Sequence, residues 1–485
     1  MSEQVLNFNL VANIGGYGGY QVMTESIMRA FATLYGEMGL DPADYISLRK
    51  VAGESAQSPS IQHWLSSARK QVQPFHFTSL GILTLNNALD LAGQSRVLYP
   101  ATECSILEPQ VVRDIEENIN QLWAASPYAA RVFMEAGISP ARVRVIPFFA
   151  DTQRFYPVAV IGETPETAGH WLTAKRLLSI DEPTAEYPLK FLIVGKYENR
   201  KASSLAVRAF LEFFEDHPLR DCVKLYCKFS TTVYARQHRE IMMDLGGALS
   251  KYPNAAKQVI ELTGEIDMLT LYNEMDFLLM PSRSEGIGLP LLEASACGVP
   301  AIITPYAALE QYTQEGAHII LPDEGMIDAH DAFYGITPQN FGQWGQVTIG
   351  GIQEAFEKAL EMTAEERWER GQNALGFVTA RPALRWAEEA YNHLADATYP
   401  KRIFEVNQDT PIAVKNPLDL SPEIKATEKI AKYLDDPAGQ IPPSPERPKE
   451  NVMFGKFEVP ASATDFNAGA GMMYREPDTE ASGDS

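Results

Sequence analysis

Short apolar runs alternate with amphipathic stretches over about the first 150 residues, and this pattern predicts parallel strands joined by helices. The first strand is expected at residues 6–14 and the first helix at about 20–36, with a glycine-rich loop between them. Further strands are predicted at 45–48, 73–77, 96–101, 121–125 and 143–149, and the clearest later helices at 110–120 and 127–136.

A second alternating set begins after residues 156–188, where Pro, Gly, Thr and Glu residues interrupt the rhythm. Its predicted strands are 191–194, 223–228, 259–262, 276–280 and 301–304, and its predicted helices are 202–214, 234–243 and 268–275. Strand–helix alternation twice over predicts an α/β protein with two doubly wound, Rossmann-like domains that face a cleft.

These patterns also divide the chain. We expect a first domain at 1–156, a linker at 157–188, a second domain at 189–382 and a terminal helix at 383–401. Residues 402–485 are rich in Pro, Asp, Glu and Gly and contain too little apolar sequence to form a core, so a largely disordered tail is predicted there.

The most informative motif is SRSEGIGLPLLEASACGVPAIIT, which carries Glu285 and Glu293 eight positions apart. Pro290 suits the first position of a short helix, and Gly298 suits the left-handed residue that ends it. Glu285 should therefore lie in the loop above a strand and Glu293 in the first turns of the helix. In parallel sheets that edge is where ligands bind.

Two carboxylates beside the free amides of Gly286, Ile287 and Gly288 would offer acceptors for hydroxyls and donors for phosphate, which suits a nucleotide-sugar. The alternative is that both glutamates are solvated side chains that complement the helix dipole.

The segment LIVGKYENRKASSLAVRAF places Lys196, Arg200 and Lys201 in a loop that feeds a helix. Cations are unfavourable at a helix N-terminus, but they would neutralise a bound diphosphate. A solvated basic turn is the alternative. The glycine loop with Gly15, Gly16 and Gly18 could likewise approach an anion, or be a tight turn that binds nothing.

Composition limits the class of protein. The net charge of −22 argues against nucleic acid binding, which relies on basic residues. No apolar run approaches the ~20 residues of a membrane span, and the N-terminus does not resemble a secretory signal. Four scattered cysteines match no zinc spacing and indicate reduced thiols in a cytoplasmic protein.

Together, these segments resemble the retaining GT-B glycosyltransferases of glycosyltransferase family 4, the group 1 glycosyl transferases. The Glu-x7-Glu motif of that family corresponds to Glu285 and Glu293, and its strand-Gly-Arg/Lys…Lys loop to Gly195, Lys196 and Lys201. Residues 122–157 are similar to the inter-domain run of the family, and 96–109 to the loop of members with a Glu where others have a His.

The resemblance implies a role for each matching position. Glu285 and the amides of residues 286–289, including that of Leu289, would hold the donor sugar and β-phosphate. Glu293 would bind the ribose hydroxyls. Lys196 and Lys201 would bind the diphosphate, and Gly16 with Gly18 would approach it from the first domain. Arg200 and Gly15, in the same two loops, are the remaining candidate donor-binding positions.

The sequence also departs from the family pattern. Position 196 is Lys where Arg is commoner, which loses bidentate phosphate recognition. No His stands clearly at the usual catalytic position of the first domain. His76 and Glu103 are the candidates there, beside Glu285 and Lys201, and each of these two can also be explained as structural.

The implied activity is metal-independent, retaining glycosyl transfer of the EC 2.4 class, from a nucleoside-diphosphate sugar to an unidentified hydroxyl acceptor. The first domain would serve the acceptor and the second the donor, and the nucleotide-sugar would be a co-substrate with no other cofactor. The alternatives are an epimerase or phosphorylase, a catalytically silent GT-B binding or regulatory protein, and a DNA-base glycosyltransferase.

Overall fold

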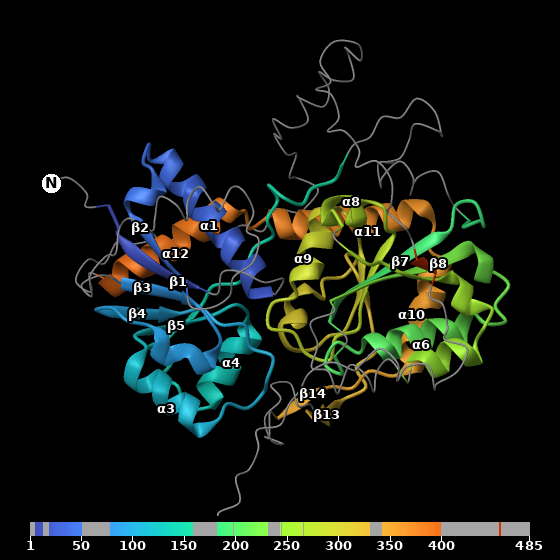
Figure 1. The fold of residues 1–485 in the computed structure, drawn as a ribbon, viewed down its shortest axis with the longest axis horizontal. Helices are drawn as coiled ribbons and strands as arrows, with labels where there is room; N and C mark the ends of the chain where they lie inside the picture. The colour runs from blue at the N-terminus through green and yellow to red at the C-terminus, as the bar shows by residue number, and fades with distance from the viewer. Residues whose placement is uncertain are drawn as a thin grey trace, which may run out of the picture.

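The computed structural model describes residues 5–12, 19–50, 78–158, 182–196, 198–230, 243, 245–264, 266–329, 342–398 and 455–456. Two large sheets, each flanked by helices, lie next to each other (Figure 1). The first sheet is built from the N-terminal part of the chain, and the second from residues that follow position 188.

The first sheet has six parallel strands in the order β2-β1-β3-β4-β5-β6. They are β1 (Phe8–Ala12), β2 (Ile46–Lys50), β3 (Thr78–Ile82), β4 (Ser95–Leu98), β5 (Gln121–Ala124) and β6 (Val143–Val145). Among the described residues of this part, the helices are α1 (Gly19–Glu37), α3 (Pro109–Asn118) and α4 (Pro127–Glu135). Helix α4 begins at Pro127 because Ser126 Oγ accepts a hydrogen bond from the Ala129 amide.

The second sheet has the order β12-β11-β10-β7-β8-β9-β15. Six of its strands are parallel, and β15 pairs antiparallel with β9 at the edge. These strands are β7 (Leu189–Lys196), β8 (Val223–Ser230), β9 (Val259–Glu261), β10 (Phe277–Met280), β11 (Ala301–Ile303), β12 (Ile319–Ile320) and β15 (Gly455–Lys456). The strand order reverses between β7 and β10, which is the position where open α/β sheets bind ligands.

The helices whose full bounds lie in the described residues of this second part are α6 (Ser203–Phe214), α8 (Met268–Asn273), α9 (Leu289–Ala296), α10 (Ile349–Glu361) and α11 (Ala364–Thr379). A separate antiparallel ribbon is formed by β13 (Met326–Asp328) and β14 (Gln343–Gly345).

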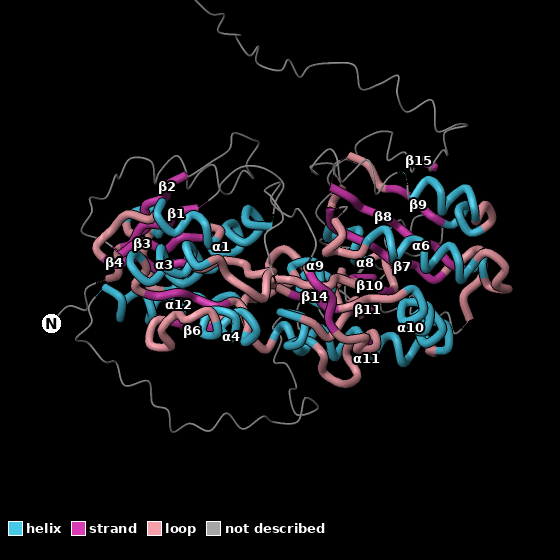
Figure 2. Tube along the Cα trace, turned by 90° about the horizontal axis from the view of Figure 1, so that it is seen from below, coloured by secondary structure: helices cyan, strands magenta, loops and turns pink. Residues whose placement is uncertain are grey.

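The last described helix, α12 (Ala383–Thr398), returns to the first sheet and packs beside α1 (Figures 1 and 2). Trp386 of α12 is fully buried there. Its ring centroid lies 5.9 Å from those of Phe31 and Tyr99, and 5.1 Å from that of Phe149. The C-terminal end of the folded chain therefore helps to form the core of the first domain.

The predicted alternation of strands and helices is confirmed in both halves, with several differences among the described residues, which include the unpredicted short strands β12 and β15. Strand β6 ends at Val145 rather than at Phe149, because Pro147 interrupts it and Phe149 packs on Trp386. Strand β3 was not predicted, since all five of its residues are buried and show no alternation. Helices α10 and α11 and the β13–β14 ribbon were also not predicted.

Some expectations fall on parts of the chain outside the described residues. They include the strand at 73–77, most of the helix at 234–243, and the tail apart from the two residues of β15. Among the described helices, none combines the length and apolarity needed to cross a membrane.

Candidate functional site

The motif around Glu285 lies directly after β10, next to the loop that follows β7. Glu285 is in the loop and Glu293 is in helix α9, as predicted. The helix begins at Leu289, so Pro290 is its second residue rather than its first. Gly298 follows the helix with a φ of +72°, the left-handed conformation expected for the residue that ends it.

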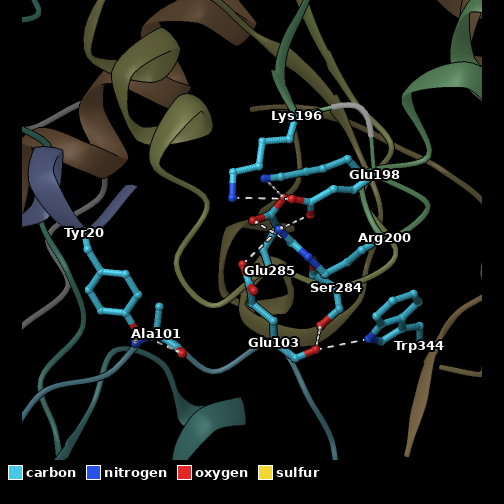
Figure 3. A network of polar contacts seen from close by, with 10 residues as sticks. Tyr20, Ala101, Glu103, Lys196, Glu198, Arg200, Ser284, Glu285 and Trp344 are labelled. Carbon is cyan, nitrogen blue, oxygen red and sulfur yellow. Dashed lines mark hydrogen bonds and ion pairs between the residues drawn. The ribbon is translucent and has the colours of Figure 1, made fainter. Parts of the chain in front are cut away.

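Six charged side chains meet at this edge of the sheet, three cations and three carboxylates (Figure 3). Two of the carboxylates and all the cations belong to the second domain, and one carboxylate comes from the first. They are Lys196, Glu198, Arg200, Lys201, Glu285 and Glu103.

The shortest contact in this cluster joins Lys201 Nζ to Glu285 Oε1, at 2.5 Å. The side chains of Lys201 and Glu285 are 14% and 5% exposed. Burial alone would raise the pKa of Glu285, but the charges of Lys201 and Arg200 outweigh it and the pKa is lowered. Glu285 is therefore held as a carboxylate beside two cations.

Lys196, at the end of β7, is the most open cation of the cluster, with 46% of its side chain exposed. Its Nζ lies 3.5 Å from Glu198 Oε1. Lys196 could therefore turn toward a ligand without leaving a buried charge unpaired.

Arg200 has different surroundings from the two lysines. Its side chain is 4% exposed, and its guanidinium contacts carboxylates on several sides, those of Glu103, Glu198 and Glu285. It also donates a 2.6 Å hydrogen bond to the carbonyl oxygen of Ser284. The surplus of positive charge expected in this loop is thus largely balanced by carboxylates. The partners of the Arg200 guanidinium are groups of the protein itself.

Glu103 reaches the cluster from the first domain, where it follows β4. Its carbonyl oxygen accepts hydrogen bonds from Ser284 Oγ at 2.8 Å and from Trp344 Nε1 at 3.1 Å (Figure 3). Burial raises the pKa of Glu103, and the nearby Arg200 opposes this shift. A Cβ atom at Gly286 would lie 2.8 Å from the Thr102 amide nitrogen, so the two domains are in close backbone contact here.

Glu293 has a separate environment within α9. Tyr272 Oη donates a 2.7 Å hydrogen bond to Glu293 Oε2. Burial raises the pKa of Glu293 to about 7, although Tyr272 and Arg154 act in the opposite direction. This carboxyl group therefore titrates near neutral pH, unlike Glu285.

The remaining predicted positions divide into two groups. The segment Gly286, Ile287 and Gly288 is buried, and Leu289 is the first residue of α9. The other predicted positions lie outside the described residues, namely Gly15, Gly16, Gly18 and His76.

Several contributing residues were not predicted from the sequence. Glu198 lies between Lys196 and Arg200, and its alternation with these cations in the loop was a signal that could have been used. Ser284 and Trp344 hold the Glu103 loop across the domain boundary. No local sequence pattern links position 344 to position 103, so only the fold could show this contact. Among the described residues, no group of three or more His, Cys, Asp or Glu side chains could hold a metal ion.

Similarity to solved structures identifies the fold. The structure of Anabaena Alr3699/HepE in complex with UDP and glucose has a TM-score of 0.54 at 13% identity, covering 80% of this chain and 99% of that chain. A structure from E. coli, described as trehalose-6-phosphate bound with UDP-2-fluoro glucose, has a TM-score of 0.53 at 13% identity, covering 80% and 98%. The chain has the GT-B fold, and the predicted fold class is confirmed.

Comparison of sequences gives a family match and curated relatives over part of the chain. Residues 188–334 match the family described as glycosyl transferases group 1. The D-inositol 3-phosphate glycosyltransferase of Acidothermus cellulolyticus is 25% identical over 232 residues, 46% of this chain and 45% of that protein. The enzyme of the same name from Geodermatophilus obscurus is 27% identical over 266 residues, 53% and 52%. The chain spans about half the length of these curated relatives.

Proposed function

We propose that the protein is a glycosyltransferase that moves a sugar from a nucleoside-diphosphate donor to a hydroxyl group of an acceptor. The observation that carries this proposal is the Lys201–Glu285 pair, 2.5 Å apart, at the strand-order reversal between β7 and β10. Lys201 would supply a cation for a diphosphate, and Glu285, beside it, a carboxylate for sugar hydroxyls. The match of this region to group 1 glycosyl transferases supports the same conclusion.

Each group has a distinct task in the proposed reaction. The bond between the anomeric carbon and the diphosphate oxygen breaks, a bond to the acceptor oxygen forms, and the acceptor proton passes to the leaving diphosphate. Lys196 and Lys201 would stabilise the negative charge that develops on the diphosphate, usually the largest catalytic contribution. Glu285 would hold the sugar, and Glu293 the ribose hydroxyls.

Retention of the anomeric configuration and independence from a metal ion are part of the proposal, and both rest on the resemblance of the Glu285–Glu293 motif. A reducing compartment such as the cytoplasm is proposed as well, because the four cysteines of the structure are free. UDP-sugars are the first donors to test, since solved structures of the same fold contain UDP or a UDP-sugar.

The test is a thermal-shift screen of nucleotide-sugars, followed by measurement of released nucleoside diphosphate with the donor that stabilises the protein. We expect turnover that persists in a chelator, and NMR of the product should show a retained anomer. Lys201→Met should lower kcat on the order of a hundredfold or more. Lys251→Met, which removes a lysine that lies 4.8 Å over the Tyr252 ring, is the matched control.

The alternatives give different results. Binding of a nucleotide-sugar without any release of nucleoside diphosphate would indicate the silent binding protein. An inverted product, or activity that disappears with a chelator and returns with magnesium or manganese, would contradict the proposed mechanism.

A further inference from the structure

Arg200 is a buried cation at the boundary between the two domains. Its backbone belongs to the loop after β7, yet its Nη2 lies 3.0 Å from Oε1 of Glu103 in the first domain. Its Nη1 lies 3.3 Å from Oε2 of Glu285 in the second. With 4% of the side chain exposed, the guanidinium is enclosed by protein rather than open to a diphosphate.

The shape of the guanidinium fits these partners. Nη1 is used by the Ser284 carbonyl oxygen and by Glu285, and Nη2 by Glu198 and Glu103 (Figure 3). A planar fork of fixed donors can serve four acceptors in different directions, whereas an ammonium group is a single point charge. The chemistry of the site therefore specifically favours arginine.

Two of these contacts act directly on Glu285. The bond to the Ser284 carbonyl oxygen fixes the backbone that precedes Glu285, and the ion pair fixes one of its carboxylate oxygens. Lys201 holds the other oxygen. With both oxygens held by cations, the orientation of Glu285 depends on Arg200.

The first domain contributes to this arrangement through a closely packed loop. Ser284 Oγ and Trp344 Nε1 both donate to the Glu103 carbonyl oxygen. Ser105 Oγ accepts a 2.7 Å hydrogen bond from the Gln343 amide. The loop that carries Glu103 is thus attached to the loop of Glu285 and to the β13–β14 ribbon.

We propose that Arg200 is a positioning residue that orients Glu285 for the donor sugar while the Glu103 loop of the first domain is docked against it. This inference rests on the proposed function for the role of Glu285. Arg200 transmits the position of the first domain to the donor site, and it does not itself bind the diphosphate.

The electrostatics of the site support this role. Burial would lower the pKa of Arg200, but its three carboxylate neighbours more than reverse the shift, so the guanidinium stays charged. Without that charge, the partly buried carboxylate of Glu103 and the buried carboxylate of Glu198 would lack their common cation. The pKa of Glu285 would rise, because one of the two cations that lower it would be gone.

The test compares Arg200→Met, Arg200→Lys and Glu103→Gln with wild type, using kcat, KM and the pH dependence of kcat. Arg200→Met should lower kcat on the order of a hundredfold, because the sugar is misplaced. The acid limb of the pH dependence of kcat should move to higher pH in Arg200→Met, which a purely structural role would not cause. Arg200→Lys should restore charge and the pH profile but only part of kcat, since it lacks the fork.

Glu103→Gln keeps the shape of the side chain and tests the positioning role of Arg200 even if Arg200→Met does not fold. It should lower kcat more than it raises KM, and Glu103→Gln combined with Arg200→Lys should cost less than the product of the two single effects. Arg131→Met is the control, because it removes an exposed cation that also contacts the other domain. A rise in KM for donor with unchanged kcat in the Arg200 variants would show a direct diphosphate ligand and overturn the proposal. So would wild-type kcat in Glu103→Gln.

An arm without substrate separates this inference from the proposed function. Thermal unfolding of wild type, Glu103→Gln, Arg200→Lys and the double variant measures the coupling of the pair across the two domains. Coupling without turnover of any donor would refute the proposed glycosyltransferase function and support the contact between Arg200 and Glu103. Turnover with no coupling would refute that contact and leave the proposed function unaffected.

Discussion

Among the described residues, the ion pairs Arg131–Glu310 and Arg200–Glu103 join the two halves of this molecule, and they differ mainly in their burial. Arg131 of α4 lies 2.7 Å from Glu310 of the second domain, with side chains 50% and 42% exposed. Arg200 lies 3.0 Å from Glu103, with side chains 4% and 20% exposed. The distances are similar, yet the first pair lies in water and the second among other charges.

The difference shows that distance is a poor guide to what an ion pair does. Exposed pairs contribute about 0–1 kcal/mol, because water screens them and both side chains lose freedom. Removal of one partner from a buried pair costs roughly 3–5 kcal/mol, because the other charge is left without compensation. We therefore expect changes around Glu103 and Glu285 to be felt in activity, and changes around Glu310 to be nearly silent.

Among the variants that compare the two ion pairs, Glu285→Gln should have the largest effect. Glutamine keeps the shape but removes the charge that Lys201 and Arg200 hold, so the donor sugar is misplaced and kcat should fall on the order of a hundredfold. Glu310→Gln makes the same chemical change at the exposed pair and should leave kcat and KM unchanged. Steady-state kinetics of Glu285→Gln and Glu310→Gln measure the two effects. Equal kcat values in the two variants would contradict the expected difference between the buried and the exposed pair.

Gly286→Ala should separate the domains at the buried contact. The new Cβ would lie 2.8 Å from the Thr102 amide nitrogen and 2.9 Å from Ala101 Cβ, so the loop must move away. Overpacking of this kind costs roughly 1–3 kcal/mol, and we expect kcat/KM to fall about tenfold as Glu103 leaves Arg200. Gly350→Ala, whose Cβ would have no neighbour within 4 Å, is the control. Undiminished activity in Gly286→Ala would show that docking of this loop is unimportant.

Donor affinity should depend on pH through Glu293, whose pKa is about 7. The ionised carboxylate accepts hydrogen bonds from ribose hydroxyls, so affinity should weaken as pH falls below 7, by at most about tenfold per pH unit. Tyr272→Phe removes a hydrogen bond that lowers this pKa, and the midpoint should rise. Titration calorimetry with the nucleoside diphosphate at several pH values measures this affinity. In Glu293→Gln the affinity should not depend on pH over this range.

The same group makes a prediction for stability without ligand. The pKa of Glu293 is raised from 4.5 by folding, so its contribution is complete below about pH 4.5 and is lost as pH rises through 7. Thermal unfolding should therefore show a smaller loss of stability as pH rises from 5 to 7 in Glu293→Gln than in wild type. A larger loss of stability in the variant would contradict the assigned pKa.

The smallest expected effect is that of Arg131→Met. It removes the exposed pair, and the free energy of unfolding should change by less than ~1 kcal/mol. Chemical denaturation measures the change, and 0.5 M salt should reduce it further because screening already weakens the pair. A loss of several kcal/mol would mean that exposure does not separate the two contacts.

The sequence was sufficient for the parts of the fold with clear periodicity. Alternating apolar and amphipathic runs located most strands of both sheets, and the Pro290 to Gly298 signals located α9. Strand β3 was missed because it is buried on both faces and carries no period-two pattern. Helix α12 was expected, but its packing on the first domain follows from contacts of Trp386 with residues distant in sequence.

The candidate site was predictable in part for similar reasons. Lys196 ends a strand, Lys201 and Glu285 lie in short motifs after strands, and the carboxyl ends of neighbouring parallel strands meet at one edge. The surroundings of Arg200 were not predictable, since Glu103 is almost a hundred positions away in sequence and belongs to the other domain. Local sequence gives the type of a charged side chain, but its burial is set by the packing of the two domains.

The most direct test of the proposed donor site is a crystal structure of the protein with the nucleotide-sugar that stabilises it. We expect a diphosphate at the end of β7 against Lys196 and Lys201, a sugar beside Glu285, and ribose hydroxyls on Glu293. Arg200 should keep its contacts with Glu103 and Glu285 and make none with the diphosphate. A nucleotide bound elsewhere, or a diphosphate held by Arg200, would contradict these expectations.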